Sequence, residues 1–512
     1  MSTPSGDASL NRPRRERDLD ALARGEVVDL LVVGGGVTGA GVALDAATRG
    51  LSVVLVEKHD LAFGTSRWSS KLVHGGLRYL ASGAVGIAHE SAVERHVLMT
   101  RTAPHLVAPF PQVVPLLPTV RPGHAALVRT GFAAGDLLRR AAGTPGSVLP
   151  RSRRVDAGRV RALAPTVRPD GLRGGLLAWD GQLCDDARLV VALARTAAAA
   201  GARVLTRCAA SEVSGSGAVL TDTLTGARLD VRARMVVNAA GVWAGQVASD
   251  VRLRPSRGTH LVLPQSAFGG LGAGLTVPVP ESTNRFVFAL PAADRRVYVG
   301  LTDEDAPGPV PDVPTPSEPE IDFLLETVNT VLAEPVGRGD LLATYSGLRP
   351  LLDASGERTA DLSRKHAVLT APDGLVTVVG GKLTTYRRMA QDAVDAALRA
   401  SGADADPCRT RSVPLVGAAA RDTLARIPAP AALVRRYGTE SVDVVAAAGG
   451  DPALLEPLCP GVDTCAAELI FAVRHEGALD VDDLLDRRTR IGLSAADRAA
   501  AVPAARAALA SG

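Results

Sequence analysis

The chain is poor in lysine, aromatic residues and cysteine. Only four of its 57 basic residues are lysines, aromatic residues make up 3%, and the five cysteines are odd in number and scattered. No Cys-x-x-Cys pair or Cys/His cluster has the spacing of a metal site, so no metal is expected and reduced thiols are predicted. The net charge of +3 is too small to indicate a nucleic-acid partner.

Long apolar runs are also missing. No run approaches the roughly 18–20 residues that a membrane-spanning helix needs. Near the N-terminus, Arg12, Arg14, Arg15 and Arg17 alternate with acidic residues, and this alternation leaves no apolar core for a signal peptide. Residues 1–18 are therefore predicted to be a flexible tail.

A nucleotide-binding pattern follows the tail. Residues 29–33 form a short apolar run that leads into Gly34, Gly36 and Gly39, which match G-x-G-x-x-G. The first glycine allows a tight turn, the second lets backbone N–H groups approach a pyrophosphate, and the third lets a helix pack close to the strand. The next apolar run ends in Glu57, placed to accept hydrogen bonds from a ribose hydroxyl. The pattern indicates a site for FAD or NAD.

Three later segments combine small and polar residues. Residues 64–80 read G-T-S-R-W-S-S-K-L-V-H-G-G-L-R-Y-L, residues 235–243 read M-V-V-N-A-A-G-V-W, and the run 375–379 is followed by G-G-K-L-T-T-Y. Strand ends that converge on one crevice from distant parts of a chain suit a long ligand.

These segments resemble the flavin-contact segments of the D-amino-acid-oxidase-like flavoproteins. The stretch S-S-K-L-V-H-G-G-L-R-Y-L specifically resembles the FAD-dependent glycerol-3-phosphate dehydrogenases, and the resemblance runs from about residue 29 to the C-terminus. It implies an FAD enzyme of glycerol metabolism that oxidises sn-glycerol 3-phosphate to dihydroxyacetone phosphate, with hydride transfer to flavin N5 and a quinone as electron acceptor. It also implies a cytoplasmic protein that associates peripherally with the inner membrane, and it leaves a homodimer and covalent flavin attachment open.

The resemblance also implies which residues contact FAD. Lys71 is one of the few lysines in a chain that otherwise uses arginine, and a guanidinium does not always replace a compact ammonium. The expected cofactor-binding residues are Gly34, Gly36, Gly39, Glu57, Thr65, Ser66, Ser70, Lys71, Gly241, Gly381, Leu383 and Thr384.

Oxidation of a secondary alcohol needs a base for the hydroxyl proton, and histidine suits that role near neutral pH. His74 lies in the H-G-G loop and His260 lies on a predicted strand, and the sequence does not choose between them. A substrate phosphate needs convergent cations. The resemblance implies that Arg78, Tyr79, Arg349, Arg364 and Lys382 bind the substrate.

Two positions depart from the family pattern. Arg67-Trp68 is bulkier than the small pair common in the family, and Leu301 replaces the first threonine of a G-T-T-D segment. Both departures bear on the fine preference for substrate and acceptor.

The predicted fold class is α/β, a Rossmann-like βαβ domain with an antiparallel-sheet substrate cap and a C-terminal helical domain. Residues 19–402 are assigned to the oxidoreductase domain and residues 403–512 to the helical domain. The FAD-binding segments are expected at about 27–80, 180–250 and 345–400, with the cap built from the intervening segments. Acid and base alternate within residues 473–491, which predicts a solvated helix surface.

Two other functions fit parts of the pattern. An oxidase of the same fold would use oxygen and act on glycerol 3-phosphate or an amino acid. A non-catalytic nucleotide-binding regulator would need none of the proposed histidines and arginines, and the dense polar loops at the strand ends argue against it.

Overall fold

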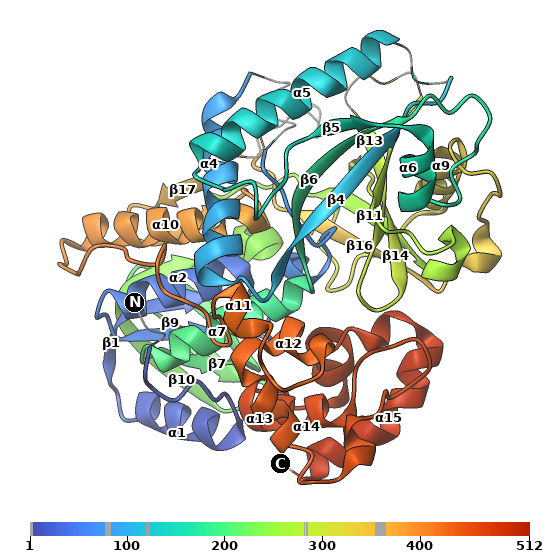
Figure 1. Ribbon diagram of the computed structural model, residues 1–512. Helices are drawn as coiled ribbons and strands as arrows, with labels where there is room; N and C mark the ends of the chain where they lie inside the picture. The colour runs from blue at the N-terminus through green and yellow to red at the C-terminus, as the bar shows by residue number, and fades with distance from the viewer. Residues whose placement is uncertain are drawn as a thin grey trace.

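The computed structural model describes residues 4–76, 83–118, 120, 122–280, 282, 285–353 and 365–511 of the chain. Within these residues the strands form two sheets, one of eight strands and one of ten. We call the eight-stranded sheet the parallel sheet, because its central strands are parallel, and the ten-stranded sheet the cap sheet. Figure 1 shows the parallel sheet at lower left, the cap sheet at upper right and the C-terminal helices at lower right. The predicted α/β fold class with a cap and a helical C-terminal domain is confirmed.

The parallel sheet has the order β17-β18-β10-β1-β2-β7, with the hairpin β8–β9 attached to β10. Its strands are β1 (Val27–Val33), β2 (Val53–Val56), β7 (Arg203–Leu205), β8 (Cys208–Ser214), β9 (Gly217–Asp222), β10 (Arg228–Asn238), β17 (Ala367–Thr370) and β18 (Val376–Val379). Strands β1, β2, β10, β18 and β7 run parallel, and their apolar residues are buried because helices cover both faces.

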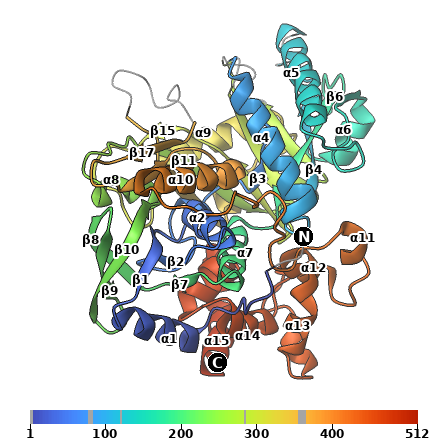
Figure 2. The same cartoon turned by 90° about the vertical axis from the view of Figure 1, so that its left-hand side faces the viewer.

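Alternate residues of β1 enter two different cores. Leu30 and Val32 pack with helices α2 (Val37–Thr48), α7 (Asp186–Ala199) and α10 (Tyr386–Ser401). Leu31 and Val33 face the opposite core, which Leu22 of helix α1 (Arg12–Ala23) enters. Figure 2 shows α1 on the side of the sheet away from α2 and α10.

The prediction that residues 1–18 are a flexible tail is wrong for the described residues 4–18. Asn11 caps α1, because its side chain accepts a hydrogen bond from the backbone N–H of Arg14. Arg15 is buried and ion-paired with Asp222 at 2.6 Å, so the helix is anchored to the sheet. The alternating charges that exclude a signal peptide belong to a polar helix that is docked on the sheet.

The cap sheet has the order β15-β11-β14-β13-β12-β4-β6-β3, with β16 beside β11 and β5 beside β6. Its strands are β3 (Leu72–Val73), β4 (Val107–Pro115), β5 (Arg153–Val155), β6 (Gly175–Leu183), β11 (Ser256–Pro264), β12 (Gly274–Pro278), β13 (Phe286–Pro291), β14 (Arg296–Gly300), β15 (Glu304–Asp305) and β16 (Ala343–Arg349). All of its pairs except β4–β12 are antiparallel, as the sequence predicts for the cap.

Helices cover the cap and form the C-terminal domain. Helix α9 (Glu318–Asn329) packs on the cap sheet and starts with a Ser317/Glu320 capping box. The remaining helices of the cap region are α4 (Val85–Val97), α5 (Pro122–Ala141) and α6 (Ala157–Leu163). The C-terminal domain contains α11 (Arg421–Leu424), α12 (Ala431–Tyr437), α13 (Ser441–Ala446), α14 (Ala466–His475) and α15 (Ala495–Ala510).

The charged stretch near the C-terminus is not the solvated surface that its alternating charges predict. It contains the π-helical turn η9 (Asp483–Arg488), whose two arginines are buried. Arg487 and Arg488 donate to the carboxylate of Asp60, which follows β2, at 2.6–2.8 Å. The acidic partners of this stretch therefore lie partly in the first domain, where the local sequence gives no sign of them.

Candidate active site

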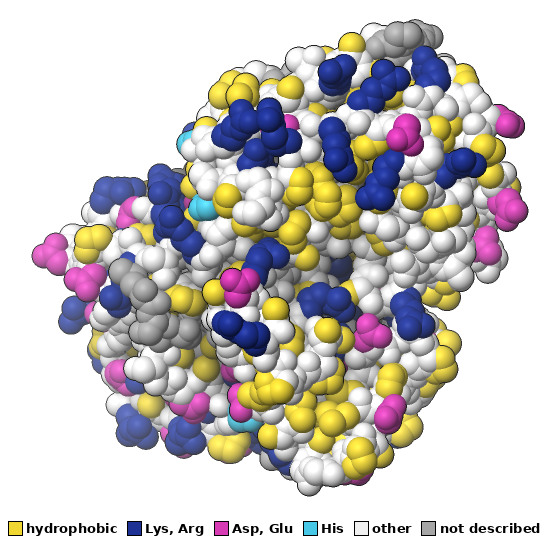
Figure 3. Space-filling model, in the orientation of Figure 1, with side chains coloured by type: hydrophobic (Ala, Val, Ile, Leu, Met, Phe, Trp, Pro, Cys, Tyr) yellow, Lys and Arg dark blue, Asp and Glu magenta, His cyan; other side chains and the backbone are white. Residues whose placement is uncertain are grey.

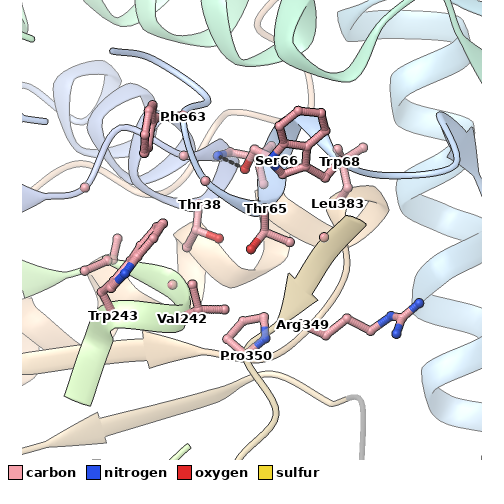
Figure 4. A pocket seen from close by; sticks show the side chains of 18 of the residues that line it. Thr38, Phe63, Thr65, Ser66, Trp68, Val242, Trp243, Arg349, Pro350 and Leu383 are labelled. Carbon is pink, nitrogen blue, oxygen red and sulfur yellow. Dashed lines mark hydrogen bonds between the residues drawn. The ribbon is translucent and has the colours of Figure 1, made fainter. Parts of the chain in front are cut away.

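A cavity of about 810 Å³ lies where the carboxyl ends of the parallel strands meet the cap sheet (Figure 4). Val33 at the end of β1 is level with Val56 of β2 and with Asn238 of β10, and Asn238 pairs with Thr377 of β18. The turns after these strands line one side, and β11 and β16 of the cap line the other. The structure thus brings together the segments that the sequence predicts to contact one long ligand.

The glycine turn leaves room for backbone to approach a ligand. A Cβ on Gly34 would lie 2.6 Å from the carbonyl oxygen of Ala239, and the φ of Gly34 is +112°. A Cβ on Gly39 would lie 1.8 Å from the carbonyl oxygen of Gly34, so α2 packs directly on the turn. Gly34 and Gly36 line the cavity, and α2 begins at Val37 with its N-terminus at the cavity. This arrangement fits a pyrophosphate.

Glu57 occupies the predicted position at the end of β2. Its carboxylate accepts hydrogen bonds from the backbone N–H groups of Gly35, at 2.7 Å, and His59, at 2.8 Å. Burial raises the pKa of Glu57, although these two hydrogen bonds act in the opposite direction. The His59 ring stacks on Phe63 at 3.9 Å, and both rings line the same end of the cavity. An acidic side chain and stacked rings at this end fit the adenosine half of a dinucleotide.

The loop after Phe63 forms a second wall. Thr65 donates a hydrogen bond to the carbonyl oxygen of Leu348 at 2.6 Å, and the hydroxyl of Ser66 accepts one from the N–H of Val37 at 2.9 Å. Figure 4 shows Thr65, Ser66 and Trp68 on one side of the cavity, with Trp243 and Val242 on another. The other predicted cofactor residues that line the cavity are Ser70, Gly241, Gly381, Leu383 and Thr384.

Lys71 does not reach the cavity wall. Its ammonium lies 3.3 Å from a carboxylate oxygen of Asp186, and the rings of Tyr298 and Tyr345 lie within 5.1 and 5.4 Å of it. The side chain is 4% exposed. Lys71 therefore supports the wall from behind, whereas Lys382 lines the cavity itself.

The two candidate histidines line the cavity in different surroundings. His74 is 38% exposed, and its Nδ1 lies 3.2 Å from Oδ2 of Asp180. Asp180 also accepts a hydrogen bond from Arg95 at 2.6 Å. Although burial would raise it, the pKa of Asp180 is held below its ordinary value by the charge of Arg95 and by His74. An ionised Asp180 favours the His74 tautomer with a proton on Nδ1, which leaves Nε2 as the acceptor.

His260 is buried in the cap. Its Nε2 lies 2.8 Å from the hydroxyl oxygen of Ser70, and its ring stacks on Tyr345 with centres 4.8 Å apart. Burial lowers the pKa of His260 to about 3, and the charges of Lys71 and Arg349 act in the same direction. His260 is therefore neutral at physiological pH.

Of the side chains predicted to bind the substrate phosphate, the structure describes Arg349 and Lys382. Arg349 at the end of β16 lines the cavity, donates to the carbonyl oxygen of Thr302 and pairs with Asp303, both at 3.1 Å. Figure 4 shows Arg349 beside Pro350, with its side chain extending away from the other labelled residues. Arg78, Tyr79 and Arg364 lie outside the described residues.

Sequence reasoning missed the groups that support the site. Asp180 of β6 holds His74, and Arg95 of α4 donates to Asp180; no local motif marks either residue. The described residues contain no group of three or more His, Cys, Asp or Glu side chains that could hold a metal ion. Leu301, the family departure in the cap, lines the cavity.

Comparisons with known proteins agree with this geometry. A family model described as FAD dependent oxidoreductase matches residues 29–387, and one described as the C-terminal domain of alpha-glycerophosphate oxidase matches residues 408–511. The glycerol-3-phosphate dehydrogenase 1 of Mycobacterium tuberculosis is 59% identical over 98% of both chains. The mitochondrial glycerol-3-phosphate dehydrogenase of Arabidopsis thaliana is 35% identical over 97% of this chain and 85% of its own.

The glycerol-3-phosphate dehydrogenase of Bacillus halodurans, solved in complex with FAD, has a TM-score of 0.74 and 26% identity, and the match covers 98% of this chain and 94% of the other. The glycine turn, Glu57 and the elongated cavity fit the same cofactor. The chain is therefore a member of the FAD-dependent glycerol-3-phosphate dehydrogenase family.

Proposed function

We propose that the enzyme oxidises sn-glycerol 3-phosphate to dihydroxyacetone phosphate and delivers the electrons to a quinone. When bound, FAD supplies the hydride acceptor, flavin N5, and transfers the electrons onward. The observation that carries the proposal is the pairing of His74 and Asp180 in one cavity with the cations Arg349 and Lys382. A base and fixed positive charges are what a phosphorylated secondary alcohol needs.

We assign the proton transfer to His74. Its Nε2 accepts the hydroxyl proton while Nδ1–H donates to Asp180, which stabilises the charge that forms on the ring. His260 is a poorer base, because its pKa of about 3 gives little driving force for taking a proton. Its hydrogen bond with Ser70 instead suits a neutral group that orients the substrate.

We assign the substrate phosphate to Arg349 and Lys382, with Arg78, Tyr79 and Arg364 as further ligands that the family resemblance implies. Arg349 is held in place by Ser256, Thr302 and Asp303, each at 3.1 Å. A guanidinium that is fixed before the substrate arrives loses little conformational entropy on binding.

The test is the visible spectrum of the purified holoenzyme under anaerobic conditions. Glycerol 3-phosphate is expected to bleach the flavin band, whereas glycerol and D-alanine are expected to leave it oxidised. A quinone analogue is then expected to restore the band faster than oxygen does. Faster reoxidation by oxygen, with peroxide as product, would identify an oxidase, and bleaching by D-alanine would reject the substrate.

The base is tested by comparing three variants. His74→Asn is expected to lower kcat by about 10²–10⁴-fold with FAD still bound, because the proton acceptor is lost. His260→Asn is expected to change KM more than kcat. His89→Asn, at an exposed position, is the control and should match the wild type. A larger loss of kcat in His260→Asn than in His74→Asn would reverse the assignment.

We also propose that the enzyme associates peripherally with the cytoplasmic face of the inner membrane, where quinone is found. No helix of the described part of the chain is long and apolar enough to cross a membrane. Helix α5 exposes Leu127 and Leu137 together with Arg129 and Arg140. Figure 3, in the orientation of Figure 1, shows basic and apolar side chains intermixed on the upper part of the molecule. Co-sedimentation with anionic but not neutral vesicles, lost at high salt, is the expected result.

A further inference from the structure

A row of stacked side chains runs from the C-terminal domain to His260. The guanidinium carbon of Arg490 lies 4.9 Å from the ring centre of Trp68. Trp68 stacks on Tyr345 with centres 5.6 Å apart, and Tyr345 stacks on His260 with centres 4.8 Å apart. These four residues come from the C-terminal domain, the loop after Phe63, β16 and β11.

Hydrogen bonds tie the row to the wall of the cavity. The hydroxyl of Tyr345 donates to the carbonyl oxygen of Ser69 at 3.0 Å, and the hydroxyl of Ser70 lies 2.8 Å from Nε2 of His260. Trp68 and His260 line the cavity, while Tyr345 is buried behind them. A shift of Trp68 would therefore move the ring on which His260 stacks.

Arg490 is held by charge and packing more than by hydrogen bonds. Its Nε lies 3.5 Å from a carboxylate oxygen of Asp185, and its Nη1 donates to the carbonyl oxygen of Asp486 at 3.1 Å. Its Nε and Nη2 are buried and have no hydrogen-bond partner among the described residues. Leaving buried donors unpaired costs free energy, so hydrogen bonding does not explain why a guanidinium is placed here. Its contacts with the Trp68 ring and Asp185 do explain it.

Two residues of the C-terminal domain reach this wall: Arg490 lies over the Trp68 ring, and Leu493 packs against the cluster that contains Tyr345. Arg67 also lies over the Trp68 ring, at 4.3 Å, but it belongs to the same loop as Trp68. Asp186 holds that loop through the backbone N–H and the hydroxyl of Ser69, at 2.9 and 2.8 Å. The guanidinium of Arg490 is thus the charged group that the C-terminal domain places over the Trp68 ring.

We propose that Arg490 is a positioning residue for the active site: it fixes Trp68 and, through Tyr345, the orientation of His260. The C-terminal domain is then part of the catalytic unit and does more than stabilise the fold. The inference rests on the proposed function, because it takes the cavity beside His260 as the glycerol 3-phosphate site.

The test compares Arg490→Gln with Arg436→Gln in the full-length holoenzyme. Arg436 is the matched control, because it is a part-buried arginine of the same domain that pairs with Glu468 at 2.6 Å and does not line the cavity. Both variants are expected to lower Tm. Only Arg490→Gln is expected to lower kcat/KM for glycerol 3-phosphate, on the order of tenfold to a hundredfold. It should also weaken binding of dihydroxyacetone phosphate, measured as a change in the oxidised flavin spectrum.

A double-mutant cycle shows whether Arg490 acts through Trp68. The effect of Arg490→Gln on kcat/KM should shrink to a small fraction in a Trp68→Leu background, because the contacted ring is gone. If Arg490→Gln does not fold, Arg490→Lys replaces it and is expected to lose less, since it keeps the charge but not the flat face. A change in Tm alone, or an undiminished effect without Trp68, would overturn the inference. Wild-type enzyme that fails to respond to glycerol 3-phosphate would instead reject the proposed function.

Discussion

Gly34 and Gly39 show how single residues set the geometry of the cofactor turn. Gly34 needs both a positive φ and the space that a Cβ would take from Ala239. Gly39 needs only the space, because a Cβ there would overlap the carbonyl oxygen of Gly34. In each case the close contact is with backbone, which cannot turn away as a flexible side chain can. The third glycine thus acts on the cofactor site through helix packing, although it does not line the cavity.

Gly39→Ala is expected to yield protein with little bound FAD, because α2 must move away from the turn that it caps. The measurement is the ratio of flavin to protein absorbance after purification, together with Tm. Gly131→Ala is the control, since this glycine of α5 has no described atom within 4 Å of an added Cβ. It should keep its FAD and gain stability of up to about 1 kcal/mol from the better helix propensity. Normal FAD content in Gly39→Ala would contradict the packing argument.

Helix α1 illustrates what an element contributes when it covers a sheet. Leu22 of α1 packs in the same hydrophobic core as Leu31 and Val33 of β1. Arg15 donates to the carbonyl oxygen of Thr206 at 2.8 Å and pairs with Asp222 at 2.6 Å. Although burial would raise it, the pKa of Asp222 is held low mainly by its hydrogen bond with Arg15. The helix therefore stabilises the outer part of the parallel sheet through one buried charge pair.

Arg15→Ala is expected to destabilise the protein by about 3–5 kcal/mol, because it leaves the buried Asp222 carboxylate without its charged partner. Arg17→Ala, on the exposed face of the same helix, is the matched control and should change stability by less than about 0.5 kcal/mol. Urea unfolding followed by far-ultraviolet circular dichroism measures both. Equal effects of the two substitutions would show that α1 is not anchored through Arg15.

At the scale of the whole molecule, buried charges join the C-terminal domain to the rest. Arg188 of α7 binds Glu476 through two hydrogen bonds of 2.6 and 2.7 Å. Asp60 accepts hydrogen bonds from Arg487 and Arg488. Although burial would raise it, the pKa of Asp60 is held well below its ordinary value by the charges of these two arginines. Breaking one partner of such a pair costs more than the pair contributes, since the other charge stays buried. The two domains are therefore expected to unfold together.

His105 makes the stability of the folded chain depend on pH. It is buried beside Gly417, and burial, assisted by the charge of Arg188, lowers its pKa to about 3. Between about pH 6.5 and pH 3 the unfolded chain binds a proton at this residue and the folded chain does not, so stability falls as the pH falls.

His105→Asn is expected to reduce the slope of unfolding free energy against pH by about 1.4 kcal/mol per pH unit in that window. The part of the slope that remains includes the contribution of His260, whose pKa is lowered in the same direction. His89→Asn, at an exposed position, should leave the slope unchanged. Urea midpoints across the window provide the measurement, and an unaltered slope in His105→Asn would contradict the assignment.

Much of the cofactor site could be predicted because its determinants are local. The turn at Gly34–Gly39, the acidic residue at the end of the second strand and the small residues at the later strand ends each act within a few residues. Parallel strands align their carboxyl ends, so a pattern at each end is enough to predict a shared crevice. The α/β fold class, the antiparallel cap and the helical C-terminal domain follow from periodicity and composition in the same way.

The residues that hold the active-site side chains in place could not be predicted, because only the tertiary structure brings them to the site. His74 finds Asp180, 106 residues away, and Arg490 lies over Trp68 on the far side of a domain boundary. Lys71 and Lys382 look equivalent in the sequence, yet one is buried against Asp186 and the other lines the cavity. A run of alternating charges has the same sequence whether water or another domain faces it. Burial, which depends on packing between distant segments, decides which of these charges is solvated and which holds the active site.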